Sequence, residues 1–105
     1  AGDNLRGQLF RNAQRFRSGM SNAGFNLLPG EHPIIPVMLG EAKRAQAMAG
    51  ALADRGVHVA GFFFPVVPKG QARIRTQMSA ALTIPDLDLA LAAFRAAGKA
   101  TGVLA

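Results

Sequence analysis

Residues 65–80 read Pro-Val-Val-Pro-Lys-Gly-Gln-Ala-Arg-Ile-Arg-Thr-Gln-Met-Ser-Ala, a loop bracketed by prolines and followed by an alternating segment. Pro65 and Pro68 fix their own φ angles and keep the preceding residues out of the helical region, which predicts a stiff, extended loop. Gly70 allows the turn that follows. From Ala72 onward the side chains are predicted to point alternately to the two faces of a sheet.

Two arginines lie on the same face of this predicted strand. Arg73 and Arg75 are two residues apart, so their side chains leave the strand about 6.6 Å from each other. They are consistent with the solvated face of a half-buried strand. They are also consistent with an anion site, because a guanidinium group matches a carboxylate or phosphate with two parallel hydrogen bonds. The alternation alone does not choose between these interpretations. The opposite face carries Ala72, Ile74, Thr76 and Met78.

The first of three predicted amphipathic helices runs from Asp3 to about Ala23 and ends at Gly24. Its apolar residues recur at helical spacing. They are Leu5, Leu9, Ala13, Phe16 and Met20.

Two further helices follow. One begins at Gly40 and Glu41 and ends at Gly56. The other is capped by Thr83, has Asp86 in its acidic first turn and ends near Gly98. The apolar stripe of the first is Ala42, Ala45, Met48, Ala49 and Leu52; that of the second is Leu87, Leu91 and Phe94, with Ala90 and Ala97.

Three other stretches are predicted strands: a short one at 25–28, one at 34–39 and one at 57–64. Pro36 has no N–H group to donate to a neighbouring strand. Regular pairing of the strand at 34–39 is therefore expected only after this residue. The third is rich in β-branched and aromatic residues, as expected of a buried strand. The predicted fold class is α+β, a two-layer sandwich in which helices cover one face of a small, mostly antiparallel sheet. Arg73 and Arg75 would lie on the uncovered face.

The composition predicts one soluble domain over residues 1–105. Half of the residues are hydrophobic, which suffices for one modest core. No signal peptide and no apolar run of about 20 residues is visible, so no membrane association is expected. The chain has no cysteine, and the spacing of His32 and His58 matches no familiar ligand pair, so no metal site is predicted.

The formal net charge of +6 raises the question of nucleic acid binding. The arginines are spread along the chain, and neither Tyr nor Trp is present to stack on bases, which argues against such binding. A free-standing basic module that binds small carboxylates, CoA or nucleic acid stays open as an alternative function.

A resemblance to a known family adds to this reading. It is carried by Gly-Glu-His-Pro-Ile-Ile-Pro-Val-Met-Leu-Gly at 30–40, Gly-Phe-Phe at 61–63 and the whole of 65–81. These motifs resemble the C-terminal domain of α-oxoamine synthases, which are pyridoxal phosphate (PLP) enzymes of fold type I. The segment 67–75 is most similar to the 2-amino-3-ketobutyrate coenzyme A ligases, or glycine C-acetyltransferases.

The resemblance implies a piece of a homodimeric enzyme of threonine degradation. Such an enzyme condenses glycine with acetyl-CoA to 2-amino-3-ketobutyrate and CoA, in the cytoplasm or, in a eukaryote, in the mitochondrion. PLP would be bound mainly by a large domain that this chain lacks, to which residues 1–23 would connect. The resemblance assigns no catalytic residue to this chain, which is expected to be inactive alone.

The site residues that the resemblance implies lie in the opening stretch. Arg75 matches the arginine that holds the carboxylate of glycine. The loop that closes over the site and contacts CoA would contain Pro65, Val67, Pro68, Lys69 and Gly70.

Two residues depart from the pattern of the family, and both departures put a polar contact in doubt. Phe64 stands where relatives carry tyrosine, and Leu82 stands where they usually carry histidine. Residues 62–64 are interpreted as core and loop anchors, or alternatively as the source of one aromatic wall beside a ligand.

Overall fold

A computed structural model describes residues 2–28, 30, 33–77 and 81–104 of the chain. In chain order these residues form α1 (Gly2–Ala23), β1 (Asn26–Leu27), β2 (Ile34–Gly40), α2 (Ala42–Ala53), β3 (Ala60–Phe62), β4 (Ala72–Gln77) and α3 (Ile84–Thr101). Met78, Ser79 and His32 lie outside the described residues.

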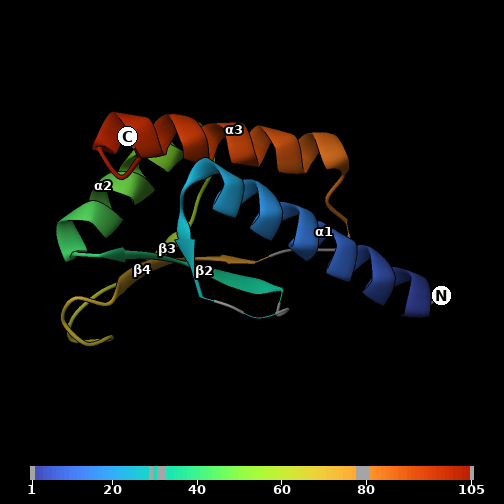
Figure 1. Cartoon of the computed structure of the whole chain (residues 1–105), viewed down its shortest axis with the longest axis horizontal. Helices are drawn as coiled ribbons and strands as arrows, with labels where there is room; N and C mark the ends of the chain where they lie inside the picture. The colour runs from blue at the N-terminus through green and yellow to red at the C-terminus, as the bar shows by residue number, and fades with distance from the viewer. Residues whose placement is uncertain (1, 29, 31–32, 78–80, 105) are drawn as a thin grey trace.

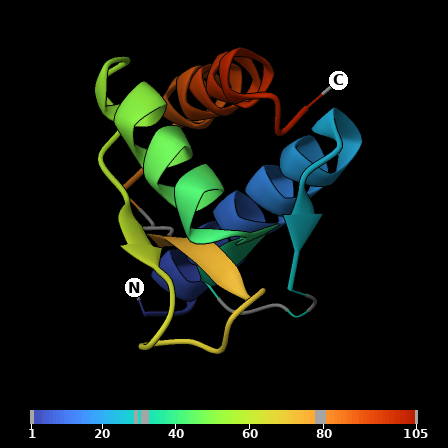
Figure 2. The same ribbon diagram turned by 90° about the vertical axis from the view of Figure 1, so that its left-hand side faces the viewer.

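The four strands form one antiparallel sheet in the order β1-β2-β4-β3. All three helices lie on the same side of this sheet, α1 and α2 against it and α3 across them, while the other face has no helix over it (Figures 1 and 2). The α+β class with helices on one face is confirmed.

The core lies between the sheet and the helices. The inward side chains of β2 and β4, such as Ile35, Val37 and Ile74, are fully buried. Phe94 of α3 meets the rings of Phe16 and Phe25 edge to face, with ring centres 5.7 and 6.0 Å apart. This geometry brings the positive edge of one aromatic ring to the negative face of another, so it adds a specific attraction to the burial of apolar surface.

The predicted strand at 57–64 is wrong in length and position. Only Ala60–Phe62 is a strand, and it forms an edge of the sheet instead of a buried centre. Val57 and Val59 still pack against the core, although their backbone is irregular. Their apolar side chains are therefore explained by burial and not by strand pairing.

The expectation that β2 pairs regularly only after Pro36 is also wrong. Pairing with β4 begins at Ile34, and Pro36 lies opposite Arg75. Proline lacks only the N–H group, and its carbonyl still accepts a hydrogen bond of 3.3 Å from the backbone N–H of Leu28.

The helices follow the predicted spacing with three differences. Leu5 is 62% exposed and does not belong to the buried stripe of α1, and Ala42 and Ala49 are only half-buried. The third difference concerns the end of α3, which continues past Gly98 to Thr101 and is capped by Gly102 with φ of 80°. No helix in the described part of the chain is long and apolar enough to cross a membrane.

Candidate carboxylate-binding site

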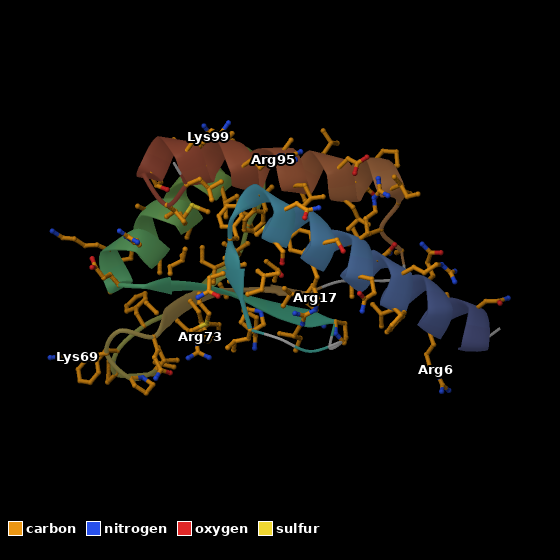
Figure 3. All side chains as sticks on the ribbon, viewed as in Figure 1. Arg6, Arg17, Lys69, Arg73, Arg95 and Lys99 are labelled. Atoms are coloured by element: carbon orange, nitrogen blue, oxygen red, sulfur yellow. The ribbon has the colours of Figure 1, made fainter. Side chains whose placement is uncertain are left out.

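The uncovered face of the sheet carries both arginines of β4. Ala72, Ile74 and Thr76 are buried towards the helices, which places Arg73 and Arg75 on the other face, as the alternation predicts. Figure 3 shows Arg73 on the side of the sheet away from the helices, with Lys69 of the neighbouring loop on the same side.

Two nitrogen atoms of the Arg73 guanidinium donate hydrogen bonds to Gln71, which lies just before β4. Its Nε donates to the backbone oxygen of Gln71 at 3.1 Å, and one terminal nitrogen donates to Gln71 Oε1 at 3.3 Å. Arg73 therefore fastens the end of the loop and has fewer donors left for a ligand.

Arg75 differs from Arg73 in its partners. Within the described residues, no carbonyl or carboxylate accepts a hydrogen bond from Arg75. Its guanidinium carbon lies 5.1 Å from the ring centre of Phe62. An exposed guanidinium with unused donors can take a carboxylate in two parallel hydrogen bonds. Arg75, which is exposed, is compatible with both predicted interpretations of this face, whereas the bonds of Arg73 to Gln71 make it the less suitable anion ligand.

The three consecutive phenylalanines have three different environments. Phe63 packs against the core, Phe62 lies under Arg75, and Phe64 is 55% exposed. The ring of Phe64 has the ammonium nitrogen of Lys69 5.1 Å from its centre. The expectation of a core anchor thus holds for Phe63, whereas Phe62 beside Arg75 and Phe64 beside Lys69 are both candidates for an aromatic wall.

Hydrogen bonds between backbone groups shape the loop between β3 and β4. The N–H groups of Val66 and Val67 both donate to the carbonyl of Phe63, at 3.0 and 3.3 Å, and the N–H of Gln71 donates to Pro68 at 3.1 Å. The loop consists of two successive turns and is not fully extended.

A hollow of about 360 Å³ separates this loop from the start of α2. Pro68, Lys69 and Gly70 line it together with residues 40–42, whereas Pro65 and Val67 are not among the lining residues. Three of the five predicted loop residues therefore share one concave surface.

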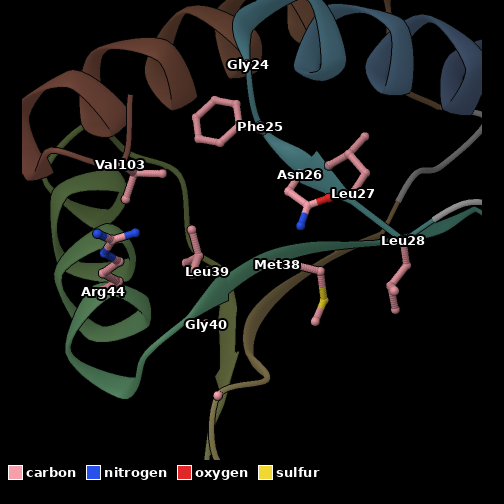
Figure 4. Close-up of a pocket in the computed structure, with 11 residues that line it drawn as sticks. Gly24, Phe25, Asn26, Leu27, Leu28, Met38, Leu39, Gly40, Arg44 and Val103 are labelled. Atoms are coloured by element: carbon pink, nitrogen blue, oxygen red, sulfur yellow. The ribbon is translucent and has the colours of Figure 1, made fainter. Parts of the chain in front are cut away.

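A larger hollow, of about 550 Å³, lies elsewhere. Figure 4 shows it between β1, the end of β2 and α2, with Asn26 on one side and Arg44 on the other. Gly70 is the one predicted site residue that lines it. Arg75 instead lines a third hollow, of about 310 Å³, together with the exposed His58.

The described residues contain no cluster of His, Cys, Asp or Glu that could hold a metal ion. They also offer no buried lysine for a cofactor such as PLP, because Lys43, Lys69 and Lys99 are all exposed. On their own these residues do not fit the binding of PLP.

Leu82 belongs to the segment that follows β4. Its side chain packs against the core, and its carbonyl accepts a hydrogen bond of 3.0 Å from Asn12 Nδ2. Asn12 is only 2% exposed, so α1 and the segment after β4 are joined by a buried polar contact that sequence reasoning missed. A polar residue in the apolar stripe of α1 was the signal.

Comparisons with known proteins agree on the relatives of this chain. A family model described as aminotransferase class I and II matches residues 1–94. The chain is 56% identical over all 105 residues to the 2-amino-3-ketobutyrate coenzyme A ligase of Escherichia coli K12, of which it covers 26%. It is 50% identical over 91 residues, or 87% of the chain, to the human mitochondrial protein of the same name, of which it covers 22%.

The solved structures include a similar fold. Serine palmitoyltransferase from S. paucimobilis, solved with bound PLP-myriocin aldimine, superposes on 99% of this chain with a TM-score of 0.92 and 31% sequence identity. The match covers 27% of that protein. The chain thus spans about a quarter of the length of the proteins that it resembles.

Proposed function

This chain belongs to the class I and II aminotransferase family, and from that premise we propose that it is the small C-terminal domain of a longer glycine C-acetyltransferase. The complete enzyme would join glycine to the acetyl group of acetyl-CoA, giving 2-amino-3-ketobutyrate and free CoA. PLP, held by the rest of that protein, would supply an electron sink for the reaction.

The observation that carries the proposal is the 56% identity to a 2-amino-3-ketobutyrate coenzyme A ligase over every residue of the chain. The comparisons give no support to a free-standing module that binds carboxylates, CoA or nucleic acid. Because the chain spans about a quarter of that relative, the activity belongs to the complete protein. The isolated chain is expected to be inactive.

Arg75 is the residue that we assign to the carboxylate of glycine. Its position on the uncovered face and its unused donors support this role. Two parallel hydrogen bonds would fix the orientation of the small substrate, and hence the bond at the α-carbon that is broken.

The loop between β3 and β4 is assigned to acetyl-CoA. Lys69 brings a positive charge to the rim of the hollow that Pro68 and Gly70 also line. A phosphate group of CoA is a suitable partner for this ammonium group. Closure of the loop would exclude water from the site.

The rest of the enzyme must supply what this chain lacks. The exposed lysines leave the binding of PLP to the large domain. Residues 1–23 are proposed as the connection to that domain, because the N-terminal half of α1 exposes Leu5 and Phe10. We further propose that the complete enzyme is a homodimer in the cytoplasm, or in the mitochondrion in the case of a eukaryotic protein.

The proposal is tested by Arg75→Ala in the complete protein. Loss of a charge-assisted contact is expected to remove about 1.5 to 3 kcal/mol of transition-state stabilisation. This loss corresponds to a decrease of roughly 10- to 150-fold in kcat/KM for glycine. The measurement is release of the CoA thiol at varied glycine and saturating acetyl-CoA.

Arg73→Ala is the matched control, because Arg73 has the same charge on the same face but bonds to Gln71. We expect it to change the dependence on glycine less than Arg75→Ala does. An unchanged glycine dependence in Arg75→Ala would remove this residue from the site.

A further inference from the structure

Phe62 and Arg75 are brought together by the register of β3 and β4. Phe62 lies directly opposite Arg73 and therefore shares the uncovered face with both arginines. Ala60, with its small side chain, lies directly opposite Arg75. The half-buried Phe62 ring thus reaches Arg75 along the diagonal, with 5.1 Å between the ring centre and the guanidinium carbon.

The ring of Phe62 attracts the guanidinium group of Arg75 without occupying its N–H donors. The positive charge is drawn to the negative face of the aromatic ring, and no acceptor atom is involved. A guanidinium group has five N–H donors, and no described residue accepts from those of Arg75. The ring can therefore reduce the freedom of a long side chain while leaving its donors available to a ligand.

The neighbouring Arg73 shows the other way to hold an arginine on this face. Its side chain is fixed by hydrogen bonds to Gln71, which consume donors. The two arginines lie on the same face of the sheet. The number of donors left for a ligand therefore differs because Arg73 bonds to Gln71 and Arg75 contacts Phe62.

We propose that Phe62 is a positioning residue, which holds the guanidinium group of Arg75 ready for the carboxylate of a small amino acid. This inference rests on the proposed function. Its specific content is that the π-face of the ring, and not merely its bulk, sets the affinity for the amino acid substrate.

The first test compares Phe62→Leu with the unaltered complete protein. An exposed cation–π contact corresponds to about a two- to fivefold change in an equilibrium constant. We expect KM for glycine to rise by that factor, while KM for acetyl-CoA and kcat stay within the error of measurement. Phe62→Tyr keeps a π-face and should keep the original KM for glycine.

The second test changes the electronic character of the ring at nearly constant shape. Phenylalanine with one, three or five ring fluorines is incorporated at position 62, and each step weakens the negative face of the ring. KM for glycine should rise stepwise with the number of fluorines. The same series at Phe63, which packs against the core, is the matched control and should show no such trend. A flat series at position 62 in folded protein would overturn the inference, even if Phe62→Leu failed to fold.

Arg75→Ala separates the failure of this inference from the failure of the proposed function. If Arg75→Ala leaves the glycine dependence unchanged, the proposed function of the site fails. If Arg75→Ala impairs glycine use but the fluorine series is flat, the positioning role of Phe62 alone fails. If both hold, adding Phe62→Leu to Arg75→Ala should cause no further loss in kcat/KM for glycine.

Discussion

Thr83 and Asp86 close the N-terminus of α3 with two reciprocal hydrogen bonds. The backbone N–H of Thr83 donates to Asp86 Oδ2 at 3.0 Å, and the backbone N–H of Asp86 donates to Thr83 Oγ1 at 3.2 Å. The bond from the backbone of Thr83, followed by that from its side chain, holds the pKa of the Asp86 carboxyl below its ordinary value of 3.8. This capping box satisfies donors that the first turn of a helix leaves unpaired.

The lowered pKa predicts a dependence of stability on pH. Because the folded state favours the ionised carboxylate, its contribution is nearly complete above about pH 5 and is lost as the pH falls through the folded pKa. Asp86→Asn should therefore lower the urea midpoint of unfolding at about pH 7 and make its decline towards about pH 3 shallower. Asp54→Asn, at an exposed acidic residue at the end of α2, is the control. An equal change in slope for both variants would contradict the prediction.

Single-residue roles could be predicted from the sequence only where a local rule sets them. The spacing of Thr83 and Asp86 predicts the cap, and alternation predicts the face of Arg73 and Arg75. The partners of the two arginines could not be predicted, because they depend on the register between β3 and β4 and on the path of the loop. The spacing of residues within one strand does not predict a diagonal contact between two strands, such as that of Phe62 with Arg75.

At the scale of elements, Gly98 lets α3 pack closely against the C-terminal tail. A Cβ atom at this position would lie 2.8 Å from Leu104 Cγ and 2.9 Å from Phe25 Cζ. The backbone N–H of Leu104 also donates to the carbonyl of Gly98 at 2.9 Å, which returns the tail onto the helix. The sequence-based expectation that Gly98 ends the helix missed this role, since a glycine needed for close packing looks the same in sequence as one needed for a turn.

Gly98→Ala is accordingly expected to destabilise the chain although alanine is the better helix former. Overpacking costs about 1 to 3 kcal/mol, which over most of this range exceeds the roughly 0.5 to 1 kcal/mol gained by replacing a helical glycine with alanine. Gly50→Ala in α2 is the matched control, because nothing lies within 4 Å of its added Cβ. It should raise the free energy of unfolding by about 0.5 to 1 kcal/mol. Urea denaturation of both variants measures the difference, and stabilisation by Gly98→Ala would refute the packing role.

The strands show where periodicity stops being informative. Alternation at 72–77 was decisive because one face is buried and the other is open. At 57–64 the apolar residues carried no equally clear period, and the segment divides into irregular backbone, a three-residue edge strand and a turn. Length and edge position are set by neighbouring strands and not by the composition of the segment.

At the scale of the whole molecule, α1 extends beyond the end of the sheet (Figure 1). Leu5 is 62% exposed and Phe10 is 47% exposed, and Phe10 lines an apolar hollow with Leu9, Ala13 and Pro33. We expect this surface to bind the remainder of the longer protein. The sequence predicted a connecting helix only through the resemblance, because an apolar stripe does not say which of its residues are covered within the same domain.

This surface predicts how two separate pieces of the enzyme would associate. The chain and the large domain would be expressed separately. In the presence of PLP, we expect release of CoA from acetyl-CoA and glycine only when the two pieces are mixed with each other. Leu5→Gln together with Phe10→Gln should weaken association by at least about tenfold, because each buried apolar side chain contributes about 1.5 to 3 kcal/mol. Leu89→Gln, at a leucine of α3 that is 71% exposed, is the control. Calorimetric titration of the large domain with each variant measures the affinity. Equal affinities of the double variant and the control would exclude the proposed contact.

The two edges of the sheet have a consequence for the chain as a separate molecule. The strands at these edges, β1 and β3, are two and three residues long. Growth of a sheet from one molecule to the next requires a run of unpaired backbone groups, which such short edges do not provide. We therefore expect the short edge strands to limit fibrillar polymerisation at the two borders of the sheet.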